Sequence, residues 1–181
     1  MAEQEIIKGC IQNNAQCQHT VFKQYAGRMM SVCLRYAATK PEAEDMLHDA
    51  FIKIFSSIKQ FRSEGSFEGW IRKITVNTCL ALLNKKRIFY SDAGMAEAIT
   101  DEAGLNIISG LTEKELIKMI SRLPDGYRIV FNLYVIEGYD HDEIAAMLNI
   151  KTVTSRSQLV KARKLLQKQI LSQQKITSRH D

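Results

Sequence analysis

The stretch DHDEIAAMLNIKTVTSRSQLVKARKLL, residues 140–166, decides the fold of the C-terminal part of the chain. Asp140 and Glu143 have the spacing of an N-cap and its capping box, so a helix begins here. Asn149 tolerates the left-handed conformation that a tight turn between two helices needs. A second helix then begins near Thr152. Its apolar positions are Leu159, Ala162, Leu165 and Leu166. The stretch therefore predicts a helix-turn-helix whose second helix is a recognition helix.

The polar face of this second helix carries side chains that suit DNA. Arg can bond both acceptors of guanine, Gln can pair with adenine, and Ser and Thr hydroxyls suit phosphate oxygens. Residues 151–179 hold eight Lys or Arg and no acid, which favours DNA over an ordinary antiparallel helix pair. We expect DNA contacts from Lys151, Thr152, Thr154, Ser155, Arg156, Gln158, Lys161 and Arg163.

Helical spacing also runs through the N-terminal half. Apolar residues recur at steps of three, four and one over 22–36. Pro41 opens the next helix, where proline is tolerated at the first position. A third helix is expected over 66–87, with Ser66 as its N-cap. Because these apolar stripes must bury one another, residues 1–90 are predicted to form one helical domain.

The chain between the two helical parts has a different composition. Residues 91–112 lose the periodicity and gain Gly, Ser and acid, which is typical of a linker. After it, one short helix stops before Pro124, and the next is closed by Gly138. The prediction is an all-α fold with two helical domains, 1–90 and 113–181, joined by a flexible linker.

Charge alternates along the chain, whose net charge is +5. Residues 41–49 carry four acids and no base, so the charges of Asp45 and Asp49 are not offset within this segment. Residues 62–90 carry six bases against two acids, and residues 91–115 carry six acids against one base. Two basic blocks separated by an acidic one suggest two anion-binding surfaces.

The first basic block also contains aromatic residues. Aromatic rings beside a cationic groove can stack unpaired bases. Phe67 and Trp70 lie three residues apart, however, and such a pair is more often part of a core. Asn77 interrupts the apolar stretch ITVNTCLALL with an amide. It is a group that contacts a base edge, a buried amide satisfied by the backbone, or a local break in the helix.

Longer blocks of the sequence resemble a known family. PEAEDMLHDAFIKIFSSIKQF (41–61), followed by GSFEGWIRKITVNTCLALLNKKR (65–87), resembles region 2 of the extracytoplasmic-function sigma factors. LPDGYRIVFNLYVIEGYDHDEIAAMLNIKTVTSRSQLVKARKLL (123–166) resembles region 4 of the same family. The order of the blocks, the acidic linker and the length match the two-region form of these proteins. The resemblance covers roughly residues 10–170.

The resemblance implies a non-catalytic subunit that binds core RNA polymerase and directs it to promoter DNA without a cofactor. The acidic helix with Asp45 and Asp49 resembles the surface that docks on the coiled coil of the largest polymerase subunit. Residues 152–163 resemble the helix that recognises the minus-thirty-five element. The family also suggests an anti-sigma factor as a partner that covers the two DNA surfaces.

The segment 66–87 resembles the element that recognises and melts the minus-ten region, and Asn77 falls where the family has a loop that captures a flipped base. The DNA contacts expected there are Arg72, Lys73, Asn77, Lys85, Lys86 and Arg87. The chain departs from the family in the second DNA-binding part. Lys151 stands where a small Ser or Thr cap is usual, and Val153 where Gly is frequent. Thr152 is the alternative cap, which shifts the start of the helix by one residue.

Two other functions account for part of the pattern. A stand-alone helix-turn-helix regulator would bind duplex DNA, but it leaves the acidic patch and the first basic block without a role. The His48-Asp49 doublet is shared with metal phosphohydrolases. His19, His141 and His180 lack a helical partner at ligand spacing, so we expect no enzyme and no catalytic or metal-binding residue.

The compartment follows from features that the sequence lacks. The four cysteines form no C-x-x-C pair and are expected to be buried, reduced thiols. No apolar run approaches the roughly 18 residues of a membrane span. The N-terminus, MAEQEIIKGC, has no signal-peptide pattern. We therefore expect no membrane insertion and a cytoplasmic protein.

Overall fold

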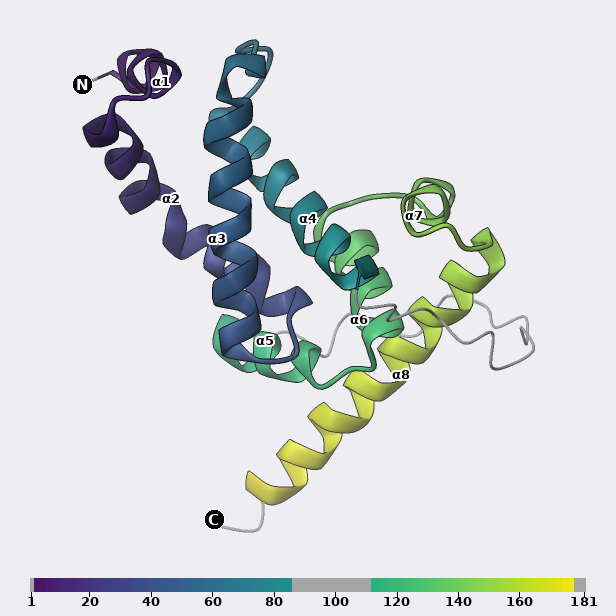
Figure 1. Cartoon of the computed structure of the whole chain (residues 1–181). Helices are drawn as coiled ribbons and strands as arrows, with labels where there is room; N and C mark the ends of the chain where they lie inside the picture. The colour runs from purple at the N-terminus through teal and green to yellow at the C-terminus, as the bar shows by residue number, and fades with distance from the viewer. Residues whose placement is uncertain (1, 86–111, 178–181) are drawn as a thin grey trace. The chain divides into compact units, whose positions relative to one another are not determined.

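The computed structural model describes residues 2–85 and 112–177, and all regular secondary structure in these two ranges is helical (Figure 1). The chain forms two compact units, Met1–Arg87 and Ile88–Asp181. The prediction of an all-α fold with two helical domains is confirmed. The predicted linker over 91–112 lies outside the described residues except for Thr112.

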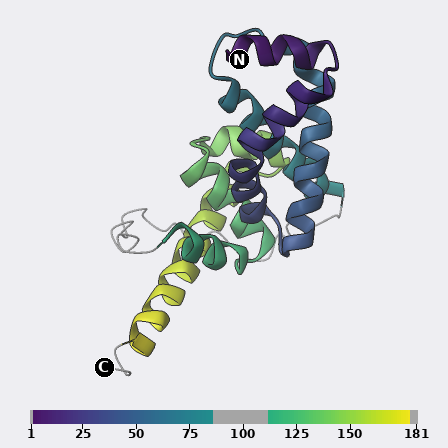
Figure 2. The same cartoon turned by 90° about the vertical axis from the view of Figure 1, so that its left-hand side faces the viewer.

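Unit 1 (Met1–Arg87) is built from α1 (Glu3–Ile11), α2 (Ala15–Tyr36), α3 (Lys40–Ser57), the 3-10 turn η1 (Ile58–Gln60) and α4 (Phe67–Lys85). Helices α2, α3 and α4 pack against one another, and α1 packs on α2 (Figures 1 and 2). This packing buries the largest apolar side chains of the unit. They are Met29, Tyr36, Met46, Ile54, Ile58, Phe67, Ile71 and Leu83.

Polar caps set the beginnings of the helices in unit 1. The Asn14 side chain accepts hydrogen bonds from two backbone N–H groups of α2, at 2.9 and 3.1 Å. Thr39 caps α3, and Pro41 lies in its first turn as predicted. The Ser66 hydroxyl accepts from the Gly69 N–H at 3.0 Å, which confirms Ser66 as the cap of α4. Each cap satisfies N–H groups that have no partner inside the helix.

The sequence pattern did not predict α1, because only Ile7 and Cys10 of this helix are buried. Its close approach to α2 depends on Gly9, since a Cβ atom there would lie 2.3 Å from the Cys17 Sγ atom. The four cysteines are free and buried, as expected. The Sγ atoms of Cys33 and Cys79 lie 3.9 Å apart. Their hydrogen bond and the burial raise the pKa of Cys79, so this thiol stays protonated at neutral pH.

Unit 2 (Ile88–Asp181) contains α5 (Glu113–Ser121), α6 (Asp125–Phe131), the π-helical turn η3 (Asn132–Ile136), α7 (His141–Leu148) and α8 (Thr152–Thr177). The long helix α8 packs on α6 and α7 and extends well past both (Figure 2). The turn before α7 uses Gly138 at φ +80°, a left-handed conformation that suits glycine. The core residues include Met119, Ile120, Val130, Leu133, Ile144, Leu159 and Ala162.

Two polar interactions hold the first helices of unit 2. Thr112 and Glu115 form a capping box at the start of α5. The N–H and the hydroxyl of Thr112 donate to the Glu115 carboxylate at 2.9 and 2.8 Å, and these bonds lower the pKa of Glu115. The buried Arg128 side chain donates to the Leu123 carbonyl at 3.0 Å and pairs with Asp125. This arginine thereby fixes the turn between α5 and α6.

Candidate nucleic-acid interface

The C-terminal candidate site is a helix-turn-helix made by α7 and the first turns of α8. Asp140 and Glu143 form the predicted capping box at the start of α7. Asn149 ends α7 in the left-handed conformation, at φ 53° and ψ 47°, as predicted. A backbone bond of 3.1 Å runs from the Ser155 N–H to the Lys151 carbonyl. Lys151 therefore occupies the N-cap position of α8, and the alternative cap at Thr152 is wrong.

Side chains at the start of α7 fix the position of the recognition helix. The Thr152 hydroxyl donates to Asp142 at 2.8 Å. His141 Nδ1 lies 2.9 Å from the Ser155 hydroxyl. The His141 ring also stacks on Tyr134, with ring centroids 4.4 Å apart. These contacts restrict how α8 can turn about its own axis relative to α7.

Two residues expected to contact DNA face the inside of unit 2 instead. Ser155 has no exposed surface, and its hydroxyl is occupied by His141. Gln158 is 7% exposed, and its amide oxygen has no hydrogen-bond partner among the described residues. Both lie on the same side of α8 as Leu159 and Ala162, because residues three to four positions apart share a helix face. Ser155 and Gln158, from which DNA contacts were expected, are therefore not accessible on the surface of α8.

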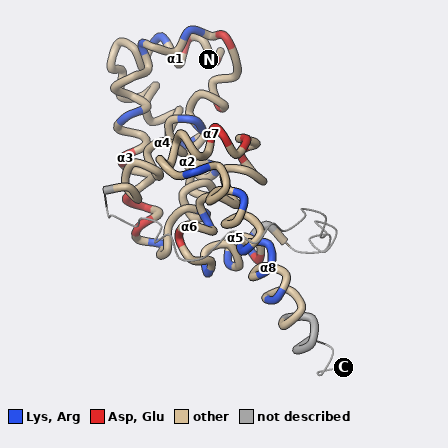
Figure 3. Tube along the Cα trace, turned by 90° about the vertical axis from the view of Figure 1, so that its right-hand side faces the viewer, with Lys and Arg blue, Asp and Glu red and all other residues tan. Residues whose placement is uncertain are grey.

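The remaining predicted residues of α8 are accessible from solvent. Lys151 and Arg156 are exposed, whereas Thr152, Thr154, Lys161 and Arg163 are half-buried. The Arg163 guanidinium lies 6.0 Å from the centre of the Tyr134 ring. Lys and Arg recur along α8 (Figure 3), and residues 151–179 hold no acid. This surface can bind a polyanion through cations and through the N-terminal end of the helix.

The second candidate surface lies on α4. Asn77 and Lys73 are exposed, and Arg72 is half-buried. Asn77 lies inside the helix rather than in a loop, which corrects one expectation, and its exposure excludes the buried-amide alternative. The Lys85 side chain, Lys86 and Arg87 lie outside the described residues. The neighbouring Thr75 and Thr78 are buried, and their hydroxyls donate to backbone carbonyls four residues earlier, which satisfies both groups inside the helix. The two hydrogen bonds measure 2.9 and 2.8 Å.

A ring cluster lies at the start of α4. Phe67 is buried, as expected for a core residue. Trp70 is only half-buried. It stacks on Phe67 with a 5.9 Å centroid distance and packs against the Phe61 ring in a tilted arrangement at 5.5 Å. The loop just before these residues, 61–66, contains Ser63 at φ 58°. Part of the indole therefore remains accessible beside the cationic face of α4.

The acidic helix α3 presents a third surface. Asp45 and Asp49 are exposed, and neither forms an ion pair with a described residue. They line a hollow of about 440 Å³ together with His48 and Leu82. Their uncompensated charge was expected from the sequence. On the described part of α3, these carboxylates are therefore available to a cationic partner.

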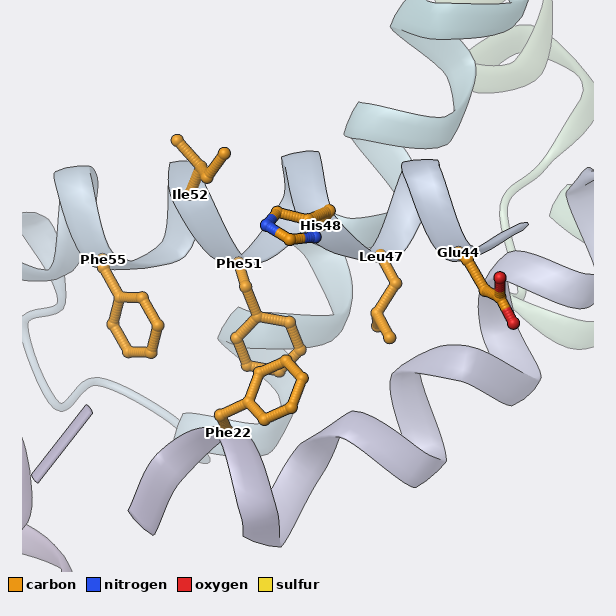
Figure 4. A pocket seen from close by; sticks show the side chains of 7 residues that line it. All are labelled: Phe22, Glu44, Leu47, His48, Phe51, Ile52 and Phe55. Carbon is orange, nitrogen blue, oxygen red and sulfur yellow. The ribbon is translucent and has the colours of Figure 1, made fainter. Parts of the chain in front are cut away.

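An apolar groove borders this acidic surface, and sequence reasoning missed it. Figure 4 shows Phe22 of α2 reaching toward Phe51 of α3, with Leu47 and Phe55 on the same side. Ile52 points away from α2. The groove has a volume of about 410 Å³, and Phe22 and Ile52 are 42% and 59% exposed. Exposed large apolar side chains grouped in this way are typical of a protein interaction surface.

Two kinds of site are absent from the described parts of the chain, a metal-ligand cluster and a membrane-spanning helix. Within residues 2–85 and 112–177, no cluster of three or more His, Cys, Asp or Glu could hold a metal ion. In these ranges no helix has the length and apolar character needed to cross a membrane.

Comparison with known proteins accounts for both units. The family model described as Sigma-70 region 2 matches residues 21–88, and the one described as Sigma-70, region 4 matches residues 113–166. The chain belongs to the sigma-70 family. Its curated relatives place this sigma factor among the ECF sigma factors, which direct transcription initiation. Members of the family are not enzymes in general.

The relatives span most of the chain. The ECF RNA polymerase sigma-E factor of Haemophilus influenzae is 23% identical over 182 residues, covering 94% of this sigma factor and 96% of the relative. SigW of Bacillus subtilis is 28% identical over 158 residues, covering 81% and 84% of the two chains. The sigma-E factor of Escherichia coli K12 is 25% identical over 182 residues, covering 94% and 95%.

Solved structures support the same fold. CnrH in complex with the cytosolic domain of CnrY matches 95% of this sigma factor and 99% of that chain, with a TM-score of 0.50 and 15% identity. The sigma factor RpoE of Bartonella quintana, in complex with the anti-sigma factor NepR, matches 85% and 96%, with a TM-score of 0.51 and 18% identity.

Proposed function

We propose that this sigma factor docks on core RNA polymerase through α3, contacts the minus-ten region through α4 and reads the minus-thirty-five element through α8. In this assignment residues 1–90 act as region 2, residues 113–181 act as region 4, and residues 91–112 link them. The observation that carries the proposal is the surface of α3. Exposed carboxylates that pair with no cation in residues 2–85 and 112–177, beside exposed apolar side chains, have no role in a protein that only binds DNA.

Docking on polymerase would use charge and apolar contact together. Asp45 and Asp49 lie four residues apart on exposed turns of α3, and Ile52 follows on the next turn. Ion pairs at the margin give orientation and speed of association. Burial of a side chain that is 59% exposed, as Ile52 is, supplies affinity. The partner surface therefore combines Lys or Arg with an apolar contact. The resemblance assigns it to the coiled coil of the largest polymerase subunit.

The minus-ten contacts are assigned to the exposed face of α4. Lys73 and Arg72 bind phosphates, and the cations at the C-terminal end of this segment, Lys85, Lys86 and Arg87, extend the same contact. Asn77 is exposed between turns whose threonines are buried, so its amide can reach a base edge from that face. Single-stranded DNA then has both a cationic track and a polar reader.

The minus-thirty-five contacts use the accessible side chains of α8. Arg156 is placed to bond a guanine, because it is exposed on the second turn of the recognition helix. Lys151, Thr154 and the backbone N–H of Thr152 bind phosphates near the N-terminus of the helix, because the Thr152 hydroxyl already donates to Asp142. Lys161 and Arg163 bind the DNA backbone farther along. Ser155 and Gln158 instead position α8 from inside.

An anti-sigma factor is the further partner. The relative from Bartonella quintana was solved with such a protein. An anti-sigma factor that covered α3 and α8 would block polymerase and DNA together. We place the protein in the cytoplasm with its polymerase, where it acts by binding and carries out no catalysis itself.

The test is the affinity for core polymerase in the absence of DNA. Asp49→Arg should weaken this affinity at least tenfold, whereas Glu64→Arg, an equal change of charge on the exposed 61–66 loop, should leave it unchanged. Both variants should keep the helical content of the wild type. If wild-type protein fails to bind core polymerase but still binds duplex DNA, the chain is a stand-alone regulator. Equal effects of the two variants would move the docking surface away from α3.

A further inference from the structure

The recognition helix carries an exposed apolar side chain in its first turn. Val153 is 55% exposed. The other large hydrophobic residues with comparable exposure in the described ranges are Phe22, Ile52 and Leu171, and none of them lies in the helix-turn-helix. An exposed valine at this position costs solvation free energy in the free protein, because its methyl groups face water. A ligand that covers it would recover that cost.

The outward direction of α8 can be determined from its buried side. Ser155, Leu159 and Ala162 are buried, and successive residues turn by about 100°. The opposite side therefore carries Val153, Ser157, Val160 and Lys164. Two valines thus lie near the centre of the face that enters the groove, and Arg156 and Lys161 lie on its two edges. The Ser157 hydroxyl donates to the Thr154 carbonyl at 3.0 Å, so its hydrogen is directed to the helix's own backbone.

The DNA major groove offers one exposed apolar group, the C5-methyl of thymine. An apolar side chain at the centre of a recognition helix matches that group, whereas hydrogen-bonding readers suit the polar edges of the other bases. A protein patch is the other surface that could cover a valine. Val153 is flanked by the exposed Lys151 and Arg156, and residues 151–179 contain no acid. These flanks favour a polyanion over an apolar protein surface.

We propose that Val153 recognises the methyl group of a thymine in the minus-thirty-five element, next to the base contacted by Arg156. The inference rests on the proposed function of α8 as the minus-thirty-five reader. It makes sequence preference at one position depend on a methyl–methyl contact rather than on a hydrogen bond. A valine here therefore sets a base preference that a glycine at the same position could not provide.

The experiment compares a methyl group removed from the protein with one removed from the DNA. Holoenzyme assembled from the full chain and core polymerase first selects its promoter from a library. Each thymine of the selected minus-thirty-five element is then replaced in turn by deoxyuridine, which lacks the C5-methyl but keeps the hydrogen-bonding groups. Affinities are measured for wild type, Val153→Ala and the control Leu171→Ala. Leu171 is 46% exposed on the same helix outside the helix-turn-helix.

We expect one deoxyuridine position to weaken wild-type and Leu171→Ala binding about fourfold, the value for burial of one methyl group. The same substitution should change Val153→Ala binding less than about twofold, the margin within which the effects of independent sites add. Val153→Ala should bind core polymerase as wild type does. Because Val153 is exposed, its replacement by alanine should not unfold the protein, so a change in DNA affinity cannot be attributed to unfolding. Val153→Ile, which keeps the methyl groups, should retain the thymine preference.

Four results would overturn the inference: no thymine in the selected element, no effect of deoxyuridine on wild type, the same effect in Val153→Ala, or a loss of core polymerase affinity in Val153→Ala. A loss of core polymerase affinity in Val153→Ala would assign the valine to a protein contact. Failure of the proposed function has a different signature. In that case a promoter with a scrambled minus-thirty-five element would bind as well as the selected one, whatever the residue at position 153.

Discussion

Replacement of His141 by phenylalanine should destabilise unit 2 by leaving one buried hydroxyl without its partner. Phenylalanine keeps a planar ring to stack on Tyr134, where the centroids are 4.4 Å apart. It removes the 2.9 Å contact with the hydroxyl of Ser155, which has no exposed surface. A buried polar group left unsatisfied costs about 1–3 kcal/mol. We expect a loss of about 1–2 kcal/mol, since a serine inside a helix can bond back to the carbonyl four residues earlier.

The double variant makes this prediction specific to the contact. In His141→Phe with Ser155→Ala, neither partner remains, and replacement of both by apolar groups is nearly neutral. The double variant should therefore be more stable than His141→Phe alone. If the two substitutions acted independently, adding the second destabilising change would instead lower the stability further. His19, which is exposed on α2, offers the matched control, and His19→Phe should change stability by less than about 0.5 kcal/mol.

The chain has a built-in way to assign the unfolding to one unit. Trp70 is its single tryptophan and lies in unit 1, so tryptophan fluorescence in a urea titration follows unit 1 alone. Far-ultraviolet circular dichroism follows the helices of both units. His141→Phe should shift the dichroism transition and leave the fluorescence transition in place. An unchanged dichroism transition, or a double variant no more stable than the single one, would refute the role of this contact.

Three further outcomes are expected. Arg156→Ala should weaken holoenzyme binding to the minus-thirty-five element by about 1–3 kcal/mol and relax its base preference, and unchanged preference would exclude Arg156 as a reader. Asn77→Ala should slow open-complex formation at one minus-ten position without a change in polymerase affinity, while Asn84→Ala, exposed on the same helix, should not; equal loss at every base would contradict base capture. The pKa of Glu115 is lowered from 4.5 by bonds from Thr112, so its cap stabilises unit 2 above about pH 4.5 and is lost as pH falls through the lowered value. Glu115→Gln should therefore lower the stability of unit 2, measured from the dichroism transition, at pH 7 but not at about pH 2. An equal loss of stability at both pH values would contradict the role of the charge.

Local chemistry explains which parts of the fold could be predicted. The capping box at Asp140, the left-handed Asn149 and the cap at Ser66 depend on residues close in sequence, and all three are confirmed. Helix α1 could not be predicted in this way. It buries only two side chains, and it is held by a close approach to α2 at Gly9, which no periodicity reveals. Contacts between distant elements decide such cases.

The apolar groove was hidden for a related reason. Phe22 continues the apolar stripe of α2, and sequence periodicity alone assigns such a residue to the core. In the structure it is 42% exposed, at the edge of a groove shared with α3. The stripe is wider than the core of unit 1 requires. The sequence pattern of such a stripe is the same whether its outermost apolar residues, such as Phe22, face a partner or the protein interior.

The recognition helix shows most clearly where the pattern misleads. Residues 154–158, TSRSQ, all offer groups that could meet DNA, and polarity alone cannot say which of them face outward. His141 decides this, because it supplies the polar partner that lets Ser155 be buried. Because Ser155 lies on the inner side of α8, Val153 lies on the outer side, although its apolar character alone would predict burial. A polar residue facing in and an apolar one facing out are together a departure from ordinary patterning. Such departures are expected where binding, rather than folding, determines the residue. The same inversion that buries Ser155 and Gln158 on α8 is therefore the reason to look for a methyl group in the DNA that this helix is proposed to read.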